Sequence, residues 1–135
     1  MRLTRSYRFS ASHRLHAPAL GEEENRAIYG KCNNAWGHGH NYVLQVSVAG
    51  RVNEATGQLV NVGALDALVR ETAIDPLDHR DLNRDVEAFA RLVPTSENVA
   101  IEIERRLRQS WPATFPALAG VRLLETKRNS FEILS

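Results

Sequence analysis

The sequence predicts an α+β domain, in which an antiparallel sheet of four main strands carries two helices on one face. Apolar and polar residues alternate over residues 41–49, which is the pattern of a half-buried strand. Residues 63–74 and 96–110 change to helical spacing, and two short apolar runs, 120–126 and 130–134, follow them. With a first strand near the N-terminus, the order is two strands, two helices and two strands. That order favours one antiparallel sheet covered by both helices.

The N-terminal half begins with a strand and a loop. Residues 3–12 mix Leu, Tyr, Phe and Ala with polar neighbours, so we expect a strand that ends near His13. Residues 16–29 indicate a loop that carries a short helix. After the second strand, residues 53–57 have the composition of a turn, and residues 58–62 are expected to return as a hairpin strand. That returning strand is too short to count among the four main ones.

Proline and capping residues set the bounds of the two helices. Pro76 ends the first helix, because proline lacks the N–H that a helix needs. Residues 78–91 form a polar connection with little regular signal. Thr95 or Ser96 then caps the second helix, which runs to about Ser110. Four main strands leave open sheet edges, so closure with another subunit is expected.

Length and composition limit the class of protein. The 135 residues suit a single domain, residues 1–135, with a core of its own. The formal net charge is +1, and no apolar run approaches the length of a membrane span, so we expect neither a nucleic-acid nor a membrane partner. One cysteine cannot form an internal disulfide, and the N-terminus lacks the apolar segment of a signal peptide. The expected compartment is the cytoplasm.

A His-Gly-His triplet at the entrance of the second strand indicates a metal site. His38 and His40 are two positions apart, and side chains two apart on a strand share a face. The first strand ends at His13 and can pair beside the second, which makes His13 the best third ligand. Three neutral imidazoles with an open fourth position match a catalytic zinc site. His16 lies beyond the strand end, and we expect it on the surface.

Cys32, the only cysteine, precedes His38 by six positions and leaves three alternatives open. As a fourth ligand it would close the metal site and make it structural. Held off the metal, its thiol would have a pKa lowered by the metal's charge and would act as a base or nucleophile. It can also be a small buried hydrophobic residue. The five residues between Cys32 and His38 permit the first two alternatives equally.

Three further residues carry acid–base chemistry or a buried charge. Asp78 and His79 are adjacent in an irregular segment, and a carboxylate that fixes the tautomer of an imidazole raises its basicity. Adjacent side chains rarely pair, however, and Asp78 can equally cap a turn. Glu125 would face inward if Leu124 and Thr126 face the other way. A buried carboxylate needs a partner, so Glu125 meets either an arginine or the donors of a ligand; a solvated strand face is its other interpretation.

Five motifs, taken in order and spacing, resemble the 6-pyruvoyltetrahydropterin synthase family. They are RFSASHRL (8–15), CNN-x-x-GHGHNY (32–42), PLDH (76–79), TSEN (95–98) and ETKRN (125–129). The resemblance covers essentially the whole chain. It implies a tunnelling fold (T-fold), whose subunit is a four-stranded antiparallel sheet with two helices on one face. It also implies closure of three subunits into a 12-stranded barrel, and a homohexamer of two such trimers with active sites at subunit interfaces.

The resemblance assigns metal and catalytic roles by motif position. It implies a zinc ion bound by His13, His38 and His40, with Cys32 as the general base. The remaining catalytic positions are the proton-relay partners and the pterin anchor, which are Asp78, His79 and Glu125.

Contacts with the substrate are implied in the same way. The family substrate is 7,8-dihydroneopterin triphosphate, and Glu125 would hold its pterin ring. Additional ring contacts are expected from Thr95, Ser96 and Glu97. Arg14 and Lys31 are candidates for the triphosphate on charge and neighbourhood.

Two related reactions fit this resemblance. The first eliminates triphosphate to give 6-pyruvoyltetrahydropterin. The second, of 6-carboxytetrahydropterin synthases on the route to queuosine, releases acetaldehyde and triphosphate from the same substrate. The five residues between Cys32 and His38, where carboxy enzymes typically have three, favour the pyruvoyl product. Ala64 departs from an acid common in the family at that position. A non-catalytic zinc- or pterin-binding module is the alternative outside enzymes.

Overall fold

The computed structural model covers residues 1–135 and is built around one mixed sheet. The strands lie in the order β3-β1-β2-β4-β5. Their bounds are β1 (Arg2–His13), β2 (His38–Ala49), β3 (Arg80–Asp81), β4 (Ala117–Leu124) and β5 (Ser130–Leu134). The four main strands are antiparallel neighbours, which confirms the predicted fold class. β3 adds a two-residue strand parallel to β1.

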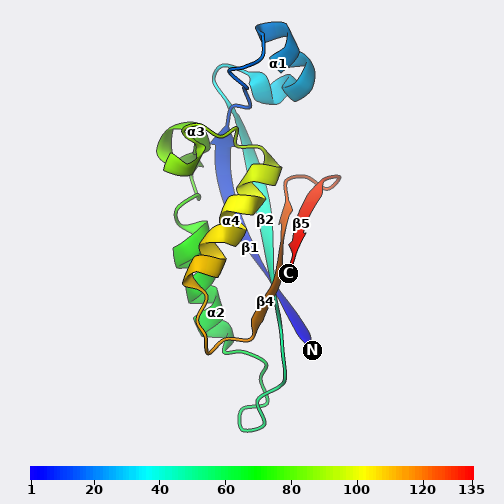
Figure 1. Cartoon of the computed structure of the whole chain (residues 1–135), viewed down its shortest axis with the longest axis vertical. Helices are drawn as coiled ribbons and strands as arrows, with labels where there is room; N and C mark the ends of the chain where they lie inside the picture. Colours follow the sequence, from blue (N-terminus) through cyan, green and yellow to red (C-terminus); the bar gives the residue numbers. More distant parts are fainter.

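Two long helical segments cover one face of this sheet (Figure 1). The first is α2 (Val62–Val69), which continues as a π-helical turn, η2 (Arg70–Ile74). The second is α4 (Ser96–Ser110), capped by the hydroxyl of Thr95, which accepts a hydrogen bond from the Asn98 N–H. The short helical elements are α1 (Glu22–Tyr29), η1 (Gly30–Asn33), α3 (Leu82–Asp85) and η3 (Glu87–Phe89).

The hydrophobic core lies between the helices and the sheet. Strand pleating turns every second residue toward the helices, so alternate residues of β1 and β2 are buried. Tyr42 and Leu44 of β2 join Leu65 of α2 and Ile103 of α4 in this core. The other face of the sheet is polar, and Ser10 there donates a hydrogen bond to Asn41 (2.6 Å). The pleat therefore determines which side chains at the strand ends can reach the helix side.

The returning hairpin strand predicted at residues 58–62 is wrong. The chain makes a turn closed by the hydrogen bond from Asn53 N–H to Gln58 O (2.8 Å), with Gly57 at a φ of 72°. Beyond the turn no strand forms, because Asn61 already caps α2 by accepting the N–H of Ala64. Ala64 itself is exposed, so its departure from the family pattern disturbs no core packing.

Two features outside the core bear on function. The outer edges of β5 and of most of β1 have no neighbouring strand within the subunit, since β3 pairs only with Ala11 and Ser12. α1 and η1 lie beyond the ends of β1 and β2 (Figure 1). None of the helices has the length and hydropathy needed to span a bilayer.

Candidate metal centre and active site

Three histidines gather where β1 ends and β2 begins. His13, the last residue of β1, is paired in register with His38, the first residue of β2. His40 lies two residues further along β2, on the face that strand pleating shares with His38. The ring of His40 has its centroid 4.7 Å from that of His13 and 4.6 Å from that of His38. The antiparallel register therefore builds a cluster of three imidazoles.

His13 has one ring nitrogen held by hydrogen bonds and the other free, as a metal ligand requires. Its side chain is buried, and its Nδ1 lies 2.9 Å from the carbonyl oxygen of Pro94 and 3.3 Å from the hydroxyl of Tyr42. A carbonyl only accepts, so Nδ1 carries the hydrogen and Nε2 keeps a lone pair. That buried Nε2 has no hydrogen-bond partner. Burial, together with the nearby His40, lowers the pKa of His13 to about 4, which leaves a neutral imidazole at pH 7.

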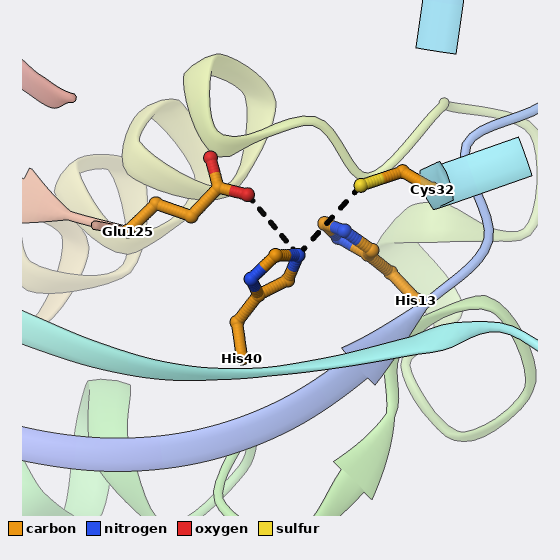
Figure 2. Close-up of side chains that lie close together, drawn as sticks. All are labelled: His13, Cys32, His40 and Glu125. Atoms are coloured by element: carbon orange, nitrogen blue, oxygen red, sulfur yellow. Dashed lines mark hydrogen bonds and ion pairs between the residues drawn. The ribbon is translucent and has the colours of Figure 1, made fainter. Parts of the chain in front are cut away.

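Four ligand atoms converge at this position. Nitrogen atoms of His13 and His40, the sulfur of Cys32 and a carboxylate oxygen of Glu125 all lie within 4.8 Å of one another. Figure 2 shows these four side chains pointing toward one centre. Nε2 of His40 is 3.8 Å from Cys32 Sγ and 3.1 Å from Glu125 Oε1. The donors are those that zinc accepts, and the unpartnered nitrogen of His13 is one of them.

His38 stands apart from this convergent set. Its side chain is exposed at the entrance of β2, although its ring adjoins that of His40. Its role as a third zinc ligand therefore stays a prediction based on the shared strand face.

Cys32 is held near the histidines by backbone and amide hydrogen bonds. It lies half-buried in η1, and its carbonyl accepts the Leu15 N–H at 2.7 Å. The amide of Asn33 donates to Leu15 O at 2.7 Å, which ties η1 to the chain that follows β1. Burial first, and then the charge of Glu125, raises the pKa of the Cys32 thiol. A nearby cation is thus required to make this thiol a thiolate at neutral pH.

Glu125 is the first residue after β4 and points toward the same centre (Figure 2). Its Oε2 accepts a hydrogen bond of 2.6 Å from the hydroxyl of Ser96 in the first turn of α4. The inward orientation expected for this carboxylate is therefore present, and its partners are Ser96 and His40 rather than an arginine. Of the other expected ring contacts, Thr95 uses its hydroxyl to cap α4, and Glu97 is exposed.

Asp78 and His79 lie elsewhere, at the outer edge of β1. Asp78 Oδ1 accepts the Ser10 N–H at 2.9 Å and lies 3.0 Å from His79 Nδ1, so these adjacent side chains do pair. His79 has a left-handed backbone, with a φ of 59°, and its side chain is 82% exposed. Both residues border a hollow with Ser10 and Asn41 on the face opposite the helices. Within one subunit, the structure does not bring them to Cys32.

Arg14 and Lys31 border a separate hollow beside η1, together with His16 and His38. His16 was expected on the surface, but it is half-buried and its Nδ1 lies 3.1 Å from the amide nitrogen of Asn33. Sequence reasoning also missed Asn33 itself. Its only sequence signal is its position directly after the cysteine, which does not reveal that its side chain is buried.

Comparison with known proteins agrees with this architecture. The sequence profile of the 6-pyruvoyl tetrahydropterin synthase family matches residues 2–134. The chain belongs to this family. It is 44% identical to a 6-pyruvoyl tetrahydrobiopterin synthase from Dictyostelium discoideum, over 94% of this chain and 90% of that protein. The structure of the 6-pyruvoyl tetrahydropterin synthase of Caenorhabditis elegans superposes with a TM-score of 0.90 at 39% identity, covering 100% of this chain and 95% of the other.

The family relationship extends more distantly to a second kind of enzyme. A protein of Halobacterium salinarum named as a probable 6-carboxy-5,6,7,8-tetrahydropterin synthase is 31% identical over 90% of this chain and 79% of its own length. The greater identity thus lies with the relatives named for the pyruvoyl product.

Proposed function

We propose that the protein converts 7,8-dihydroneopterin triphosphate to 6-pyruvoyltetrahydropterin with elimination of triphosphate. The single observation that carries this proposal is the convergence of a thiol, a carboxylate and imidazoles at one centre in a member of this family. These groups are the ones that the reaction needs: a metal site, a base for carbon-bound protons and an acceptor for the pterin ring.

The metal is proposed to be zinc, held by His13, His38 and His40. The fit rests on the unpartnered, buried Nε2 of His13 and on the clustering of the three rings around His40. Bound there, zinc would polarise the side-chain hydroxyls of the substrate and acidify the adjacent carbons. Three neutral nitrogen ligands leave a position open for those hydroxyls, as catalytic zinc sites require.

Cys32 is proposed as the general base. Its sulfur lies beside His40 and faces the centre that the histidines define (Figure 2). The element that carries it, η1, is hydrogen-bonded to Leu15. In this proposal the thiol stays off the metal and accepts a proton from the substrate.

Asp78 and His79 are proposed to relay that proton from a neighbouring subunit. They form an ion-pair-like contact of 3.0 Å next to the unpaired part of the β1 edge, and the His79 side chain projects into solvent. A second subunit can pair with the unpaired backbone groups of a free strand edge. We infer the trimeric 12-stranded barrel on the same ground, and we infer the hexamer of two such trimers from membership of the family.

Glu125 is proposed to bind the pterin ring. A carboxylate can accept two parallel hydrogen bonds from the 2-amino group and the N3–H of a pterin. Ser96 already donates to Oε2, which fixes the carboxylate plane near the metal centre. Glu125 therefore links ring recognition to the position where the side chain of the substrate reacts.

Product analysis tests this proposal. The zinc-loaded protein is incubated with 7,8-dihydroneopterin triphosphate, and the pterin product is identified by mass spectrometry. A pyruvoyl product with released triphosphate is expected. A carboxy product with acetaldehyde would instead assign the second reaction, which the Halobacterium salinarum relative represents. Absence of turnover by the zinc-loaded protein would refute both enzymatic assignments.

A further inference from the structure

A hollow of about 500 Å³ lies beside η1, at the end of the sheet where the histidines gather. Its charged lining is strongly unbalanced. Three permanent cations border it, Arg14, Arg26 and Lys31, against the single carboxylate of Glu22. The whole chain carries only one net positive charge, so this concentration of cations is local. Such a lining attracts a ligand with several negative charges.

A buried asparagine orients two of the groups in this lining. The backbone oxygen of Asn33 accepts a hydrogen bond of 3.2 Å from Nε of Arg14, which leaves both terminal nitrogens of that guanidinium available to a ligand. The side-chain nitrogen of Asn33 must face Leu15 O, 2.7 Å away, so the amide orientation is fixed. The same nitrogen donates to Nδ1 of His16 at 3.1 Å. Because Nδ1 accepts this hydrogen bond, Nε2 is the nitrogen of the His16 ring that can donate to a ligand.

The hollow adjoins the proposed catalytic centre through neighbouring residues. Lys31 directly precedes Cys32 in η1, and Asn33 directly follows it. His38 lines the hollow while its ring adjoins that of His40. A ligand whose reactive part lies at Cys32 can therefore extend an anionic tail along η1.

We propose that this hollow binds a condensed phosphate chain, namely the triphosphate group of the substrate. The inference rests on the proposed function for the identity of the substrate. The proposal adds Arg26 and His16 to the predicted contacts Arg14 and Lys31. It also implies that the negative charge of Glu22 weakens binding. Glu22 lies 3.9 Å from Arg26 and is 90% exposed, so it offsets part of the positive charge of the hollow and contributes little to the stability of the fold as an ion pair.

Two substitutions on α1 should change the affinity in opposite directions. Inorganic triphosphate is titrated into the zinc-loaded protein by calorimetry. Arg26→Gln should weaken binding about fivefold to tenfold, and Glu22→Gln should strengthen it about twofold to fivefold, with both effects shrinking as salt is added. Arg51→Gln, an exposed arginine that does not line the hollow, should leave binding unchanged. Bound zinc is quantified after each titration, because triphosphate chelates divalent cations.

Affinities that do not differ among these variants and the wild type would overturn the proposal. Steady-state kinetics test whether the hollow binds the triphosphate group of the substrate as well as free triphosphate. Arg26→Gln should raise the KM for 7,8-dihydroneopterin triphosphate in proportion to the loss of affinity, with a smaller change in kcat. An unchanged KM would contradict the assignment to the substrate. Wild-type protein that binds triphosphate as expected, yet turns over no substrate, would refute the proposed function and leave the anion site standing.

Discussion

Cys32 is the side chain whose role, metal ligand or base, decides the mechanism. Its sulfur lies 3.8 Å from Nε2 of His40, close enough to share a metal with that imidazole or to accept a proton beside it. Burial and Glu125 both raise the pKa of this thiol, so a free thiolate at neutral pH needs a cation nearby. In the proposed mechanism the imidazoles bind the metal, and the sulfur accepts the proton.

Replacement of the thiol should separate these roles. Cys32→Ala is expected to keep one zinc per subunit and to reduce kcat by about 10²-fold to 10⁴-fold, because only the base is lost. Metal analysis and steady-state kinetics measure the two effects. His13→Ala serves as the comparison and should lose the zinc itself. Loss of zinc from Cys32→Ala would mean that the sulfur is a ligand.

At the residue level, the sequence predicts those side-chain positions that follow from the alternation of residues along a strand. The clustering of His13, His38 and His40 follows from pairing two strands whose histidines lie at facing ends. The partners that prepare His13 could not be predicted, because Pro94 contributes a backbone oxygen from 81 residues away. The burial of Asn33 depends likewise on the path of the chain after β1. Such contacts carry no local pattern.

At the element level, a charged network docks α2 onto β1. Asp66 of α2 accepts hydrogen bonds from Arg5 Nη2 (2.7 Å) and from the hydroxyl of Tyr7 (2.7 Å). The Asp66 side chain is only 18% exposed. The hydrogen bond from Arg5, and then that from Tyr7, lowers the pKa of Asp66. The network therefore stabilises the fold only while this carboxyl is ionised.

The stability of the fold should depend on pH through Asp66. A carboxyl whose pKa is lower when folded stabilises the protein above its unfolded pKa of about 3.9, and this contribution is lost as the pH falls through the folded pKa. Asp66→Asn should lower the free energy of unfolding at pH 7 by about 1 kcal/mol, with a difference from the wild type that shrinks below pH 4. Urea unfolding at fixed protein concentration measures this. The exposed Asp75→Asn is the control, and an equal effect there would refute the role of the network.

The elements themselves were predictable where their signal is local. The alternation in β2 and the capping residue Thr95 of α4 both gave the right element. The hairpin strand at 58–62 failed because Asn61 caps α2, and capping competes with strand formation for the same few residues. β3 could not be anticipated, since two residues carry no periodicity and form a strand only by pairing with β1.

At the scale of the whole molecule, the residues proposed for catalysis do not all lie together within one subunit. Cys32 lies on the helix side of the sheet, whereas His79 borders the opposite face at the free edge of β1. The left-handed backbone of His79 is a costly conformation that is common at functional positions. If neighbouring subunits pair through the free edges of β1 and β5, the His79 of one subunit can serve the Cys32 of another.

Mixed assemblies should reveal this sharing. Cys32→Ala and His79→Asn are each expected to lose most of their activity; asparagine is chosen because it tolerates the left-handed backbone. When the two are unfolded, mixed equally and refolded, roughly a quarter of the sites should receive both wild-type residues and regain activity. Native mass spectrometry verifies that mixed assemblies form. Mixed assemblies without recovered activity would mean that each site is built within one subunit.

In the proposed mechanism, imidazoles hold the metal and leave Cys32 free for proton transfer. X-ray absorption at the zinc edge of the metal-loaded wild-type protein tests it most directly. We predict a first shell of nitrogen and oxygen atoms only, at about 2.0–2.1 Å, with no sulfur. A sulfur neighbour at about 2.3 Å would place Cys32 on the metal, close the site and contradict the proposed mechanism.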